Sequence, residues 1–343
     1  MPTNSAAWLV AEKAKPLEVR PAPYTPPGEN EIVIKNKAVA INPVDWIIQD
    51  FALFSLSYPA ILGRDVAGEV VEVHSSVTRY RLGDRVVGHA AGLGSRRDCE
   101  NAFQEYTVLR TNMSSPIPPS ISFEAASVIP LGFSTAACGL YQKNYLELEF
   151  PSVNPSPNGQ VLLVWGGASS VGSNGIQLGV SSGYEVITTT STKNFDYVRN
   201  LGASQVFDYK SSTIVADLVE AMKGRTIAGV LDCITLDGAV EVCAELLAKS
   251  EGKGHKKFIS TVRGAAEEMA GGVKTKWIFA SNISRDLEVS QAVYVDYLPK
   301  ALAEGKFVPA PEPLVVGKGL HSIQDGLEVA KKGMSAKKVV ITL

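Results

Sequence analysis

Residues that bind metals or form disulfides are scarce in this chain of 343 residues. The cysteines are Cys99, Cys138, Cys233 and Cys243, and the histidines are His74, His89, His255 and His321. No two cysteines form a C-x-x-C pair, and no histidine lies at metal-ligand spacing from a cysteine or from another histidine. A chain of this length can build a large core without disulfides, so we expect free, mostly buried thiols, surface or structural histidines, and no metal site.

Charge of one sign and long apolar runs are also missing. The 33 basic and 35 acidic residues nearly cancel, which gives no electrostatic reason to expect nucleic acid or a membrane surface as a partner. No apolar run approaches the roughly 18 residues that suggest a membrane span. The N-terminus, MPTNSAAWLVAEKAKPLEV, lacks the charged-then-apolar order of a secretory signal. We therefore expect a cytoplasmic protein that binds neither nucleic acid nor membrane.

One stretch organises the rest of the chain. It is 160–183, printed here with the preceding Gly159 as GQVLLVWGGASSVGSNGIQLGVSSG. It predicts a buried strand at 161–165, a glycine-rich turn at 166–172 and a helix toward 183, the order that a dinucleotide-binding site requires. The turn reads G-x-S-x-x-G, with serine where a second glycine is usual, and serine is small enough for the backbone to approach a pyrophosphate. The predicted cofactor-binding residues here are Gly167, Ala168, Ser169, Ser170, Val171 and Gly172.

Strand and helix patterns alternate after this turn. Strands are expected at 186–190, 205–207, 229–234 and 257–261, and helices at 194–201, 213–222 and 239–248. Such alternation implies right-handed crossovers and a parallel, doubly wound α/β sheet. Taken alone, a degenerate glycine motif fits a tight strand-to-helix turn that binds no ligand equally well. Within an alternating pattern of strands and helices, the same motif predicts nucleotide binding.

The first 127 residues have a different pattern. Short alternating segments at 31–37, 68–74, 84–88 and 103–109 are separated by Pro and Gly turns, which is typical of a compact β unit. The tail returns to this pattern, with an amphipathic helix expected at 322–332 and a strand at 338–343. A terminal strand that rejoins the first sheet would make a domain of 1–127 completed by 284–343, around a nucleotide-binding domain of 128–283.

Several blocks ahead of the glycine turn carry a family resemblance. They are NPVDW at 42–46, LGRDVAGEV at 62–70, GDRV at 83–86, AFQEY at 102–106, and 130–136. This set resembles the medium-chain dehydrogenase/reductase superfamily, and within it the zinc-independent quinone and enoyl reductases, especially fungal trans-acting enoyl reductases and TOXD-like proteins. The resemblance covers essentially the whole chain. It implies a β-rich GroES-like domain built from the N-terminal part and the tail, a Rossmann domain between them, and an active site in the cleft.

The resemblance also implies chemistry without zinc. Zinc alcohol dehydrogenases place a cysteine near 42–45 and a histidine-glutamate pair where this chain has Arg64 and Asp65. Their four-cysteine structural lobe corresponds to 92–101, which offers only Cys99. The chemistry that remains is hydride donation from a reduced nicotinamide to an electrophilic carbon of an enone, enal, enoyl thioester or quinone.

Catalytic candidates follow from the resemblance by position. Asn42 and Asp45 are expected at the cleft, and Ser134 and Thr135 near the nicotinamide. The structural alternatives are an Asx turn for the first pair and a helix N-cap for the second. Tyr58 is a candidate proton donor, although solvent would serve equally. The aromatic segment 46–58 around it would line an apolar substrate pocket or form part of the β-domain core.

The end of the second strand favours NADPH as the cofactor. No Asp or Glu follows this strand to bind a ribose 2′-hydroxyl, whereas Ser191 and Lys193 would attract a 2′-phosphate. In similar reductases a tyrosine after the third strand contacts the adenosine phosphate region, and Tyr209 matches it. The alternative for Lys193 is a solvated lysine at a helix start.

The leading hypothesis is an NADPH-dependent, zinc-independent reductase of activated double bonds or quinones with a small hydrophobic, carbonyl-conjugated substrate. A narrower alternative is a trans-acting enoyl reductase that serves a polyketide synthase and therefore contacts a carrier protein. A third is a non-catalytic NADPH-binding or crystallin-like protein. The sequence is compatible with a monomer and with a homodimer joined along a sheet edge at 274–281. It also leaves the identity of the hydride acceptor open.

Overall fold

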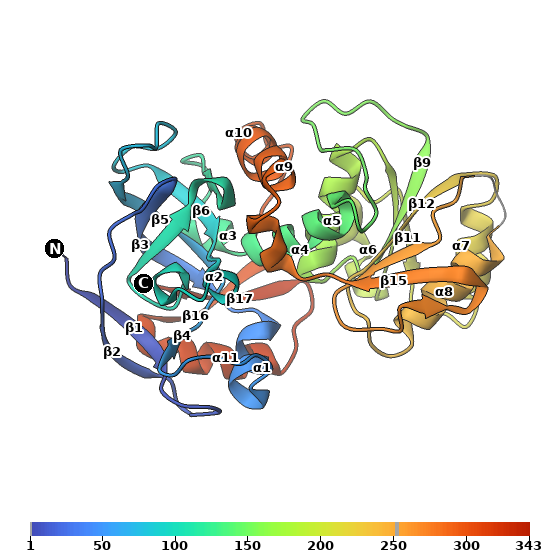
Figure 1. Cartoon of the computed structure of the whole chain (residues 1–343). Coiled ribbons are helices and arrows are strands. Elements are labelled where there is room, and N and C mark those ends of the chain that lie inside the picture. The colour runs from blue at the N-terminus through green and yellow to red at the C-terminus, as the bar shows by residue number, and fades with distance from the viewer. Residues whose placement is uncertain (1, 251–253) are drawn as a thin grey trace. The chain divides into compact units, whose positions relative to one another are not determined.

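The computed structural model describes residues 2–250 and 254–343, which divide into two compact units (Figure 1). Unit 1 contains the chain up to Leu131, Tyr294–Gly305 and Pro309–Leu343, and unit 2 contains Gly132–Val293 and Lys306–Val308. The limits expected from the sequence were 127 and 284, and that division into folding domains stays a prediction.

Unit 2 is built on a seven-stranded sheet with the order β11-β10-β9-β12-β13-β15-β14. Its strands are β9 (Gln160–Trp165), β10 (Glu185–Thr190), β11 (Gln205–Asp208), β12 (Thr226–Asp232), β13 (Phe258–Thr261), β14 (Glu268–Met269) and β15 (Val273–Trp277). All neighbouring pairs are parallel except β14 with β15. The order of the six parallel strands is that of a Rossmann sheet, which confirms the predicted doubly wound α/β fold.

Helices cover both faces of this sheet. They are α4 (Pro130–Tyr141), α5 (Ser170–Ser181), α6 (Phe195–Asn200), α7 (Ile214–Ala221) and α8 (Ala239–Lys249). The short helix α9 (Leu287–Ser290) also belongs to unit 2. Val161, Leu163 and Trp165 of β9 belong to a core cluster with α7 and α8, whereas Leu162 and Val164 face α5. The apolar run of β9 is therefore buried on both sides, as a central parallel strand requires, and Figure 1 shows α5 and α8 on opposite sides of the sheet.

The segment 274–281 is not the outermost strand of the sheet. β14 pairs with the first part of β15, through Glu268 with Lys274 and Met269 with Val273. Trp277, beyond the paired part, is 45% exposed, and the choice between a monomer and a homodimer stays a prediction.

Unit 1 contains two sheets with the orders β2-β1-β4 and β16-β17-β3-β5-β6-β8, and β7 pairs with β3. The strands are β1 (Asn4–Leu9), β2 (Glu18–Ala22), β3 (Glu31–Ala40), β4 (Ala60–Ile61), β5 (Asp65–Val73), β6 (Arg85–His89), β7 (Tyr106–Arg110), β8 (Ser114–Pro116), β16 (Glu312–Lys318) and β17 (Lys337–Thr342). The helices are α1 (Pro43–Phe51), α2 (Gly92–Ser95), α3 (Phe123–Ser127), α10 (Leu298–Ala303), α11 (Ile323–Lys331) and a π-helix at Gln291–Tyr297 that begins in unit 2.

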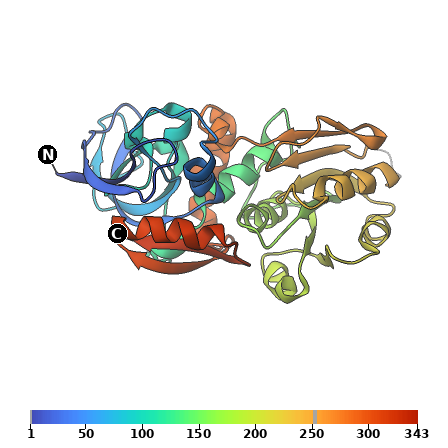
Figure 2. The same cartoon turned by 90° about the horizontal axis from the view of Figure 1, so that it is seen from below.

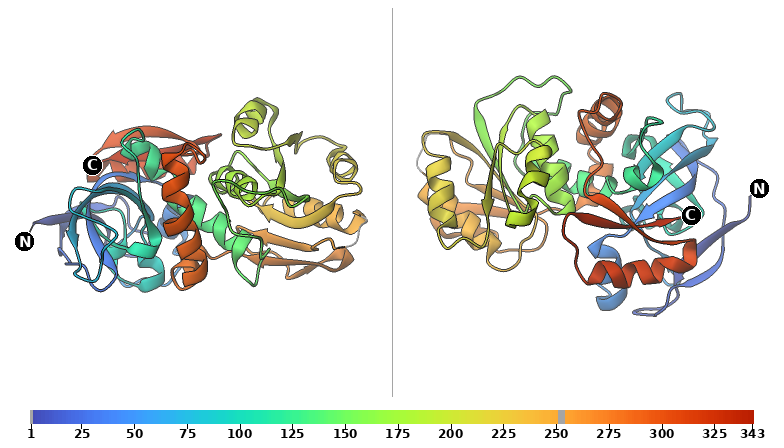
Figure 3. Two further views of the ribbon diagram at one scale, coloured as in Figure 1. Left: turned by 90° about the horizontal axis from the view of Figure 1, so that it is seen from above. Right: turned by 180° about the vertical axis from the view of Figure 1, so that it is seen from behind.

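The C-terminal tail completes the larger sheet of unit 1. β17 pairs antiparallel with β3, with Val340 opposite Ala40, and Figure 2 shows the red tail beside the blue N-terminal strands. α11 packs against β16 and β17 (Figure 3). The predicted return of a terminal strand and its preceding helix to the first sheet is therefore confirmed.

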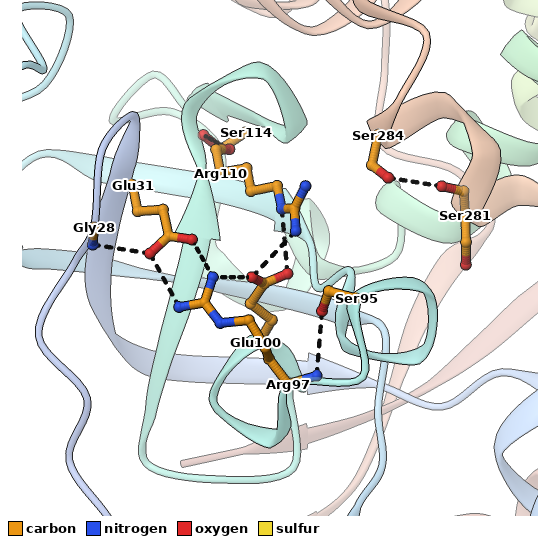
Figure 4. A network of polar contacts seen from close by, with 9 residues as sticks. All are labelled: Gly28, Glu31, Ser95, Arg97, Glu100, Arg110, Ser114, Ser281 and Ser284. Atoms are coloured by element: carbon orange, nitrogen blue, oxygen red, sulfur yellow. Dashed lines mark hydrogen bonds and ion pairs between the residues drawn. The ribbon is translucent and has the colours of Figure 1, made fainter. Parts of the chain in front are cut away.

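An ionic network holds the segment 92–101, where the sequence resemblance pointed to a missing zinc lobe. Arg97 bonds to both Glu31 and Glu100, and Arg110 Nε donates to Glu100 Oε2 at 3.2 Å (Figure 4). Burial acts to raise the pKa of Glu31, but hydrogen bonds from Arg97 and the Gly28 N–H hold it below its ordinary value. Carboxylates and guanidinium groups thus supply cross-links in a segment that has one cysteine.

One segment of the described chain, Phe123–Tyr141, is long and apolar enough to cross a membrane by length and composition alone. It is 78% buried inside the protein, and buried core helices pass the same test, so it is weak evidence for a span.

Candidate functional site

Hydrogen bonds from neighbouring elements hold the glycine-rich turn between β9 and α5. The N–H of Gly167 donates to the Thr189 carbonyl oxygen at 2.9 Å, and the N–H of Gly166 donates to the Thr189 hydroxyl at 3.1 Å. The Ser173 hydroxyl donates to the Gly167 carbonyl oxygen at 3.2 Å and lies 2.8 Å from the Tyr197 hydroxyl. β10 and α6 therefore both contribute to the shape of the turn, and sequence reasoning had missed Tyr197.

Two glycines of this turn have no room for a side chain. A Cβ atom on Gly172 would lie 2.3 Å from the Gly166 carbonyl oxygen, and one on Gly167 would lie 2.2 Å from the Thr188 hydroxyl oxygen. Gly166 has a φ of 82°, in the left-handed region that favours glycine. The turn thus brings β9 and α5 as close together as a dinucleotide-binding turn requires.

Ser169, at the degenerate position of the motif, is the N-cap of α5. Its side-chain oxygen accepts a hydrogen bond from the Gly172 N–H at 3.0 Å. The helix that follows is 12 residues long, so its N-terminus carries partial positive charge that favours a phosphate. The small side chains of Gly167–Gly172 and the helix end fit a dinucleotide pyrophosphate, which these residues would hold.

The other predicted cofactor residues lie at the same edge of the sheet. β9, β10 and β11 are parallel neighbours, so their carboxyl ends meet at one edge. Ser191 precedes a short 3-10 turn that contains the exposed Lys193, and its hydroxyl accepts from Asn194 Nδ2 at 3.2 Å. Tyr209, 44% exposed, directly follows β11. The structure therefore brings all these residues to the carboxyl edge, while their roles stay predictions.

Sequence reasoning missed the loop that follows β12. Asp232 is fully buried, and its Oδ1 accepts hydrogen bonds from the N–H groups of Ile234 and Thr235, both at 3.0 Å. Thr235 has a φ of 54°, which is rare for a β-branched residue. Because the strand order reverses between β9 and β12, this loop lies where such sheets bind ligands. The available signal was an acidic residue at the end of a buried strand, followed by Gly238.

Asn42 and Asp45 lie at the start of α1 in unit 1, not in an isolated Asx turn. The Asn42 N–H donates to Asp45 Oδ2 at 2.9 Å, and both side chains are buried. Burial raises the pKa of Asp45 to about 6, although Arg64 acts against this shift. Pro43 at the first helical position and the acidic residue two later are a recognisable helix-start signal.

Asp65 contacts three separate segments of unit 1 and was not among the predicted site residues. Its Oδ2 accepts from Asn42 Nδ2 at 2.9 Å and from Lys338 of β17. Its Oδ1 accepts from the Leu131 N–H, at the start of α4, at 2.6 Å. Lys338 also donates to the Val128 carbonyl oxygen at 2.9 Å. One buried carboxylate therefore holds the caps of two helices.

Arg64 and His89 lie near this carboxylate. Arg64 is 2% exposed and bonds to Asn101 Oδ1 and to the Gly63 carbonyl oxygen. His89 of β6 lies opposite Asp65 of β5 in the antiparallel strand register. Burial lowers the pKa of the His89 imidazole to about 3, so the ring is neutral at physiological pH. The cluster combines two acidic and two basic side chains with a neutral imidazole.

Ser134 and Thr135 lie inside α4, so the N-cap alternative for them is wrong. Ser134 is fully buried and Thr135 is 9% exposed. A Cβ on Gly132 would lie 2.6 Å from Ser170 Oγ and 2.8 Å from Asn174 Nδ2, so this part of α4 packs directly against the start of α5. The two hydroxyl residues are thus carried by a helix in contact with the helix of the glycine turn.

The aromatic segment 46–58 is partly core and partly exposed. Trp46, Phe54, Leu56 and Tyr58 pack against the core of unit 1. Phe51 and Leu53, however, are 64% and 47% exposed. Burial raises the pKa of Tyr58, so its phenol stays protonated at neutral pH. The structure places Tyr58 at the edge of the core, and its role as proton donor stays a prediction.

The cysteines have the expected state. Cys138, Cys233 and Cys243 are buried, Cys99 is half-buried, and all four are free. Burial raises the pKa of the Cys138 thiol, so it remains protonated.

Comparisons with known proteins cover the whole chain. The family model for the alcohol dehydrogenase GroES-like domain matches residues 28–119, and the model for zinc-binding dehydrogenase matches residues 170–254. The chain is 50% identical to the zinc-binding alcohol dehydrogenase domain-containing protein cipB of Emericella nidulans, over 99% of this chain and 98% of that protein. It is 39% identical to the trans-enoyl reductase himH of Aspergillus japonicus, over 99% and 97% of the two chains.

A solved structure has the same fold. An alcohol dehydrogenase superfamily protein from Novosphingobium aromaticivorans superposes with a TM-score of 0.79 at 22% identity, covering 99% of this chain and 100% of that one. At this identity the likeness concerns the fold alone.

The side chains present do not fit zinc, which the description of the second family model raises. In residues 2–250 and 254–343, no three His, Cys, Asp or Glu side chains are grouped so that they would hold a metal ion. The positions that the sequence resemblance assigned to a catalytic zinc contain Asn42, Arg64 and Asp65, and a guanidinium group repels a cation.

Proposed function

Because this chain belongs to the medium-chain dehydrogenase/reductase superfamily, in its enoyl reductase branch, and is an oxidoreductase, we propose that it uses NADPH to reduce an activated C=C bond or a quinone without zinc. The observation that carries the proposal is the tight Gly167–Gly172 turn at the N-terminus of α5, at the same sheet edge as Ser191 and Lys193. A bound nicotinamide would supply the hydride.

The residues of the chain then have separate tasks. Gly167–Gly172 bind the pyrophosphate, and Ser191, Lys193 and Tyr209 bind the adenosine phosphate. Asn42, Asp45, Ser134 and Thr135 orient the nicotinamide and the substrate. Tyr58 or solvent delivers the proton to the carbon next to the carbonyl once hydride has arrived at the distant carbon.

Lys193→Ala tests the cofactor proposal. We expect the wild type to prefer NADPH over NADH by at least about tenfold in kcat/KM, because a lysine and a hydroxyl attract the 2′-phosphate. The variant should lose this preference because its KM for NADPH rises while its KM for NADH stays unchanged. Lys223→Ala, which removes an exposed lysine of the same unit that pairs with Glu220, is the control and should retain the preference. Equal use of both cofactors by the wild type would overturn the assignment.

Turnover across a substrate panel tests the reaction itself. Oxidation of NADPH is followed at its absorbance maximum with free enones, enals and quinones, and with enoyl groups carried by a carrier protein. We expect turnover with at least one class; NADPH binding without any turnover would favour a non-catalytic binding protein.

A second candidate is a trans-acting enoyl reductase that works with a polyketide synthase. It is favoured by the 39% and 31% identity to proteins named trans-enoyl reductases. Faster reduction of the carrier-bound enoyl group than of the same group on a small thiol would support this candidate, and equal rates would count against it.

A further inference from the structure

The strongest polar arrangement outside the predicted site residues is centred on Asp65. Its side chain is fully buried, and the three donors that reach it come from distant parts of the sequence. Asn42 caps α1, Leu131 is in the first turn of α4, and Lys338 is in the terminal strand β17. A carboxylate at the N-terminus of α4 is also favoured by the helix dipole.

We propose that Asp65, held by Lys338, is the positioning residue that fixes the Asn42 amide and the start of α4, and this inference rests on the proposed function. The two carboxylate oxygens have separate tasks. Oδ2 accepts from Asn42 Nδ2 at 2.9 Å, while Oδ1 accepts from the Leu131 N–H at 2.6 Å. The side chain therefore needs two acceptors, and a group with only one cannot hold both helix starts.

Lys338 of β17 is the third partner of Asp65. The Lys338 side chain is 4% exposed, and its ammonium group donates to Asp65 and, at 2.9 Å, to the Val128 carbonyl oxygen. Tyr294 donates its hydroxyl hydrogen to the Pro130 carbonyl oxygen at 3.1 Å. The residues just before and at the start of α4 are thus held at Val128, Pro130 and Leu131.

The consequence for function follows along the helix. Gly132 packs against Ser170 and Asn174 of α5, and Ser134 and Thr135 lie within one turn of Leu131. An α4 start that moves would shift these hydroxyl groups, and displacements of about 1 Å at a reacting centre cost on the order of a hundredfold in rate. Asp65 touches neither substrate nor cofactor in this scheme and acts through Asn42 and α4.

Asp65→Asn is the sharpest test, because it keeps the shape and removes one acceptor. The NH2 group of the new side chain is a donor and would face either Asn42 Nδ2 or the Leu131 N–H. One of these two hydrogen bonds to residue 65 is therefore lost. We expect kcat to fall by at least about tenfold with the KM for NADPH within about twofold of wild type. Hydrogen exchange in peptides covering 128–135 should become faster, with peptides covering β9 unchanged. Unchanged kcat and exchange would overturn the proposal.

Lys338 variants separate positioning from simple stability. Lys338→Arg should keep kcat within about threefold, since a guanidinium group can donate to both Asp65 and Val128. Lys338→Met should lower kcat, whereas Lys337→Met, at the exposed neighbour on β17, should not. If single variants fail to fold, the double variant Asp65→Asn/Lys338→Met removes both buried charges, and it should fold yet keep a low kcat. A double variant with wild-type kcat would refute the proposal.

The exchange measurement also separates this proposal from the proposed function. If the wild type reduces no substrate, faster exchange at 128–135 in Asp65→Asn would still support the role of Asp65 in holding α4. If the wild type is active but this exchange does not change, the positioning role falls and the proposed function stands.

Discussion

Gly172→Val should weaken NADPH binding by at least about a hundredfold, or about 2.7 kcal/mol, and lower the free energy of unfolding by roughly 1–3 kcal/mol. A Cβ at this position would lie 2.3 Å from the Gly166 carbonyl oxygen and 2.7 Å from the Gly167 Cα. Both are backbone atoms, so no side-chain rotation relieves the clash. The start of α5 must move away from β9, and the proposed pyrophosphate site moves with it.

NADPH fluorescence titration and thermal unfolding measure the two effects. Gly264→Ala is a matched control in the same unit, because no atom lies within 4 Å of the added Cβ and the residue has no positive φ. It should bind NADPH as the wild type does, with stability unchanged or raised by about 0.4–1 kcal/mol. A folded Gly172→Val protein with wild-type affinity would show that the turn does not hold the cofactor. Gly172→Ala gives the same test with a smaller side chain if the valine variant does not fold.

The parallel sheet and its glycine turn were predictable because their signals are local. A buried apolar strand, two glycines and a helix within about 20 residues leave few alternatives. The start of β12 was harder to predict from the sequence. The sequence predicts that the strand begins at Gly229, but this glycine lies at a register shift inside a strand that begins at Thr226. Its φ of 122° and the packing of Leu146 against it explain the glycine, and neither is visible in the sequence.

The polar cluster of unit 1 could be predicted only in part. Asn42 and Asp45 were selected by resemblance, and the N-P-V-D pattern also marks a helix start. For Lys338 the sequence predicts only a place in the terminal strand. Its contact with Asp65 joins residues 273 positions apart and depends on the pairing of β17 with β3. No periodicity within either segment reports such a contact, because it is created by sheet assembly.

Asp45→Asn should make the protein more stable at pH 7.5 by about 1–3 kcal/mol, and this advantage should vanish near pH 4. Asp45 is fully buried, and burial raises its pKa to about 6 from an ordinary value of 3.8. Between these values the folded protein keeps a proton that the unfolded chain releases. The stabilisation from this proton is therefore complete below about pH 4 and is lost as the pH rises through about 6.

The upper limit of the effect follows from the size of the shift. A difference of about two pKa units corresponds to roughly 3 kcal/mol. This limit already includes the favourable interaction of Arg64 with the Asp45 charge, because that interaction lowers the pKa that burial raises. The asparagine oxygen can still accept from the Asn42 N–H, so the cap of α1 is retained. Urea unfolding of both proteins at pH 4, 5, 6 and 7.5 gives the difference at each pH.

Asp50→Asn, on the same helix, should show the opposite sign. Hydrogen bonds from Lys15 and Lys331 lower the pKa of Asp50, so its charged form stabilises the folded protein above about pH 4. The Asp50 variant should be less stable than the wild type at pH 7.5, and the difference should shrink on acidification. If both variants change stability equally at every pH, the environment of Asp45 does not disfavour its charge. Opposite pH trends from two aspartates of α1 would instead show that the lysine partners of Asp50 and the burial of Asp45, not helix position, determine which carboxylate the fold keeps ionised.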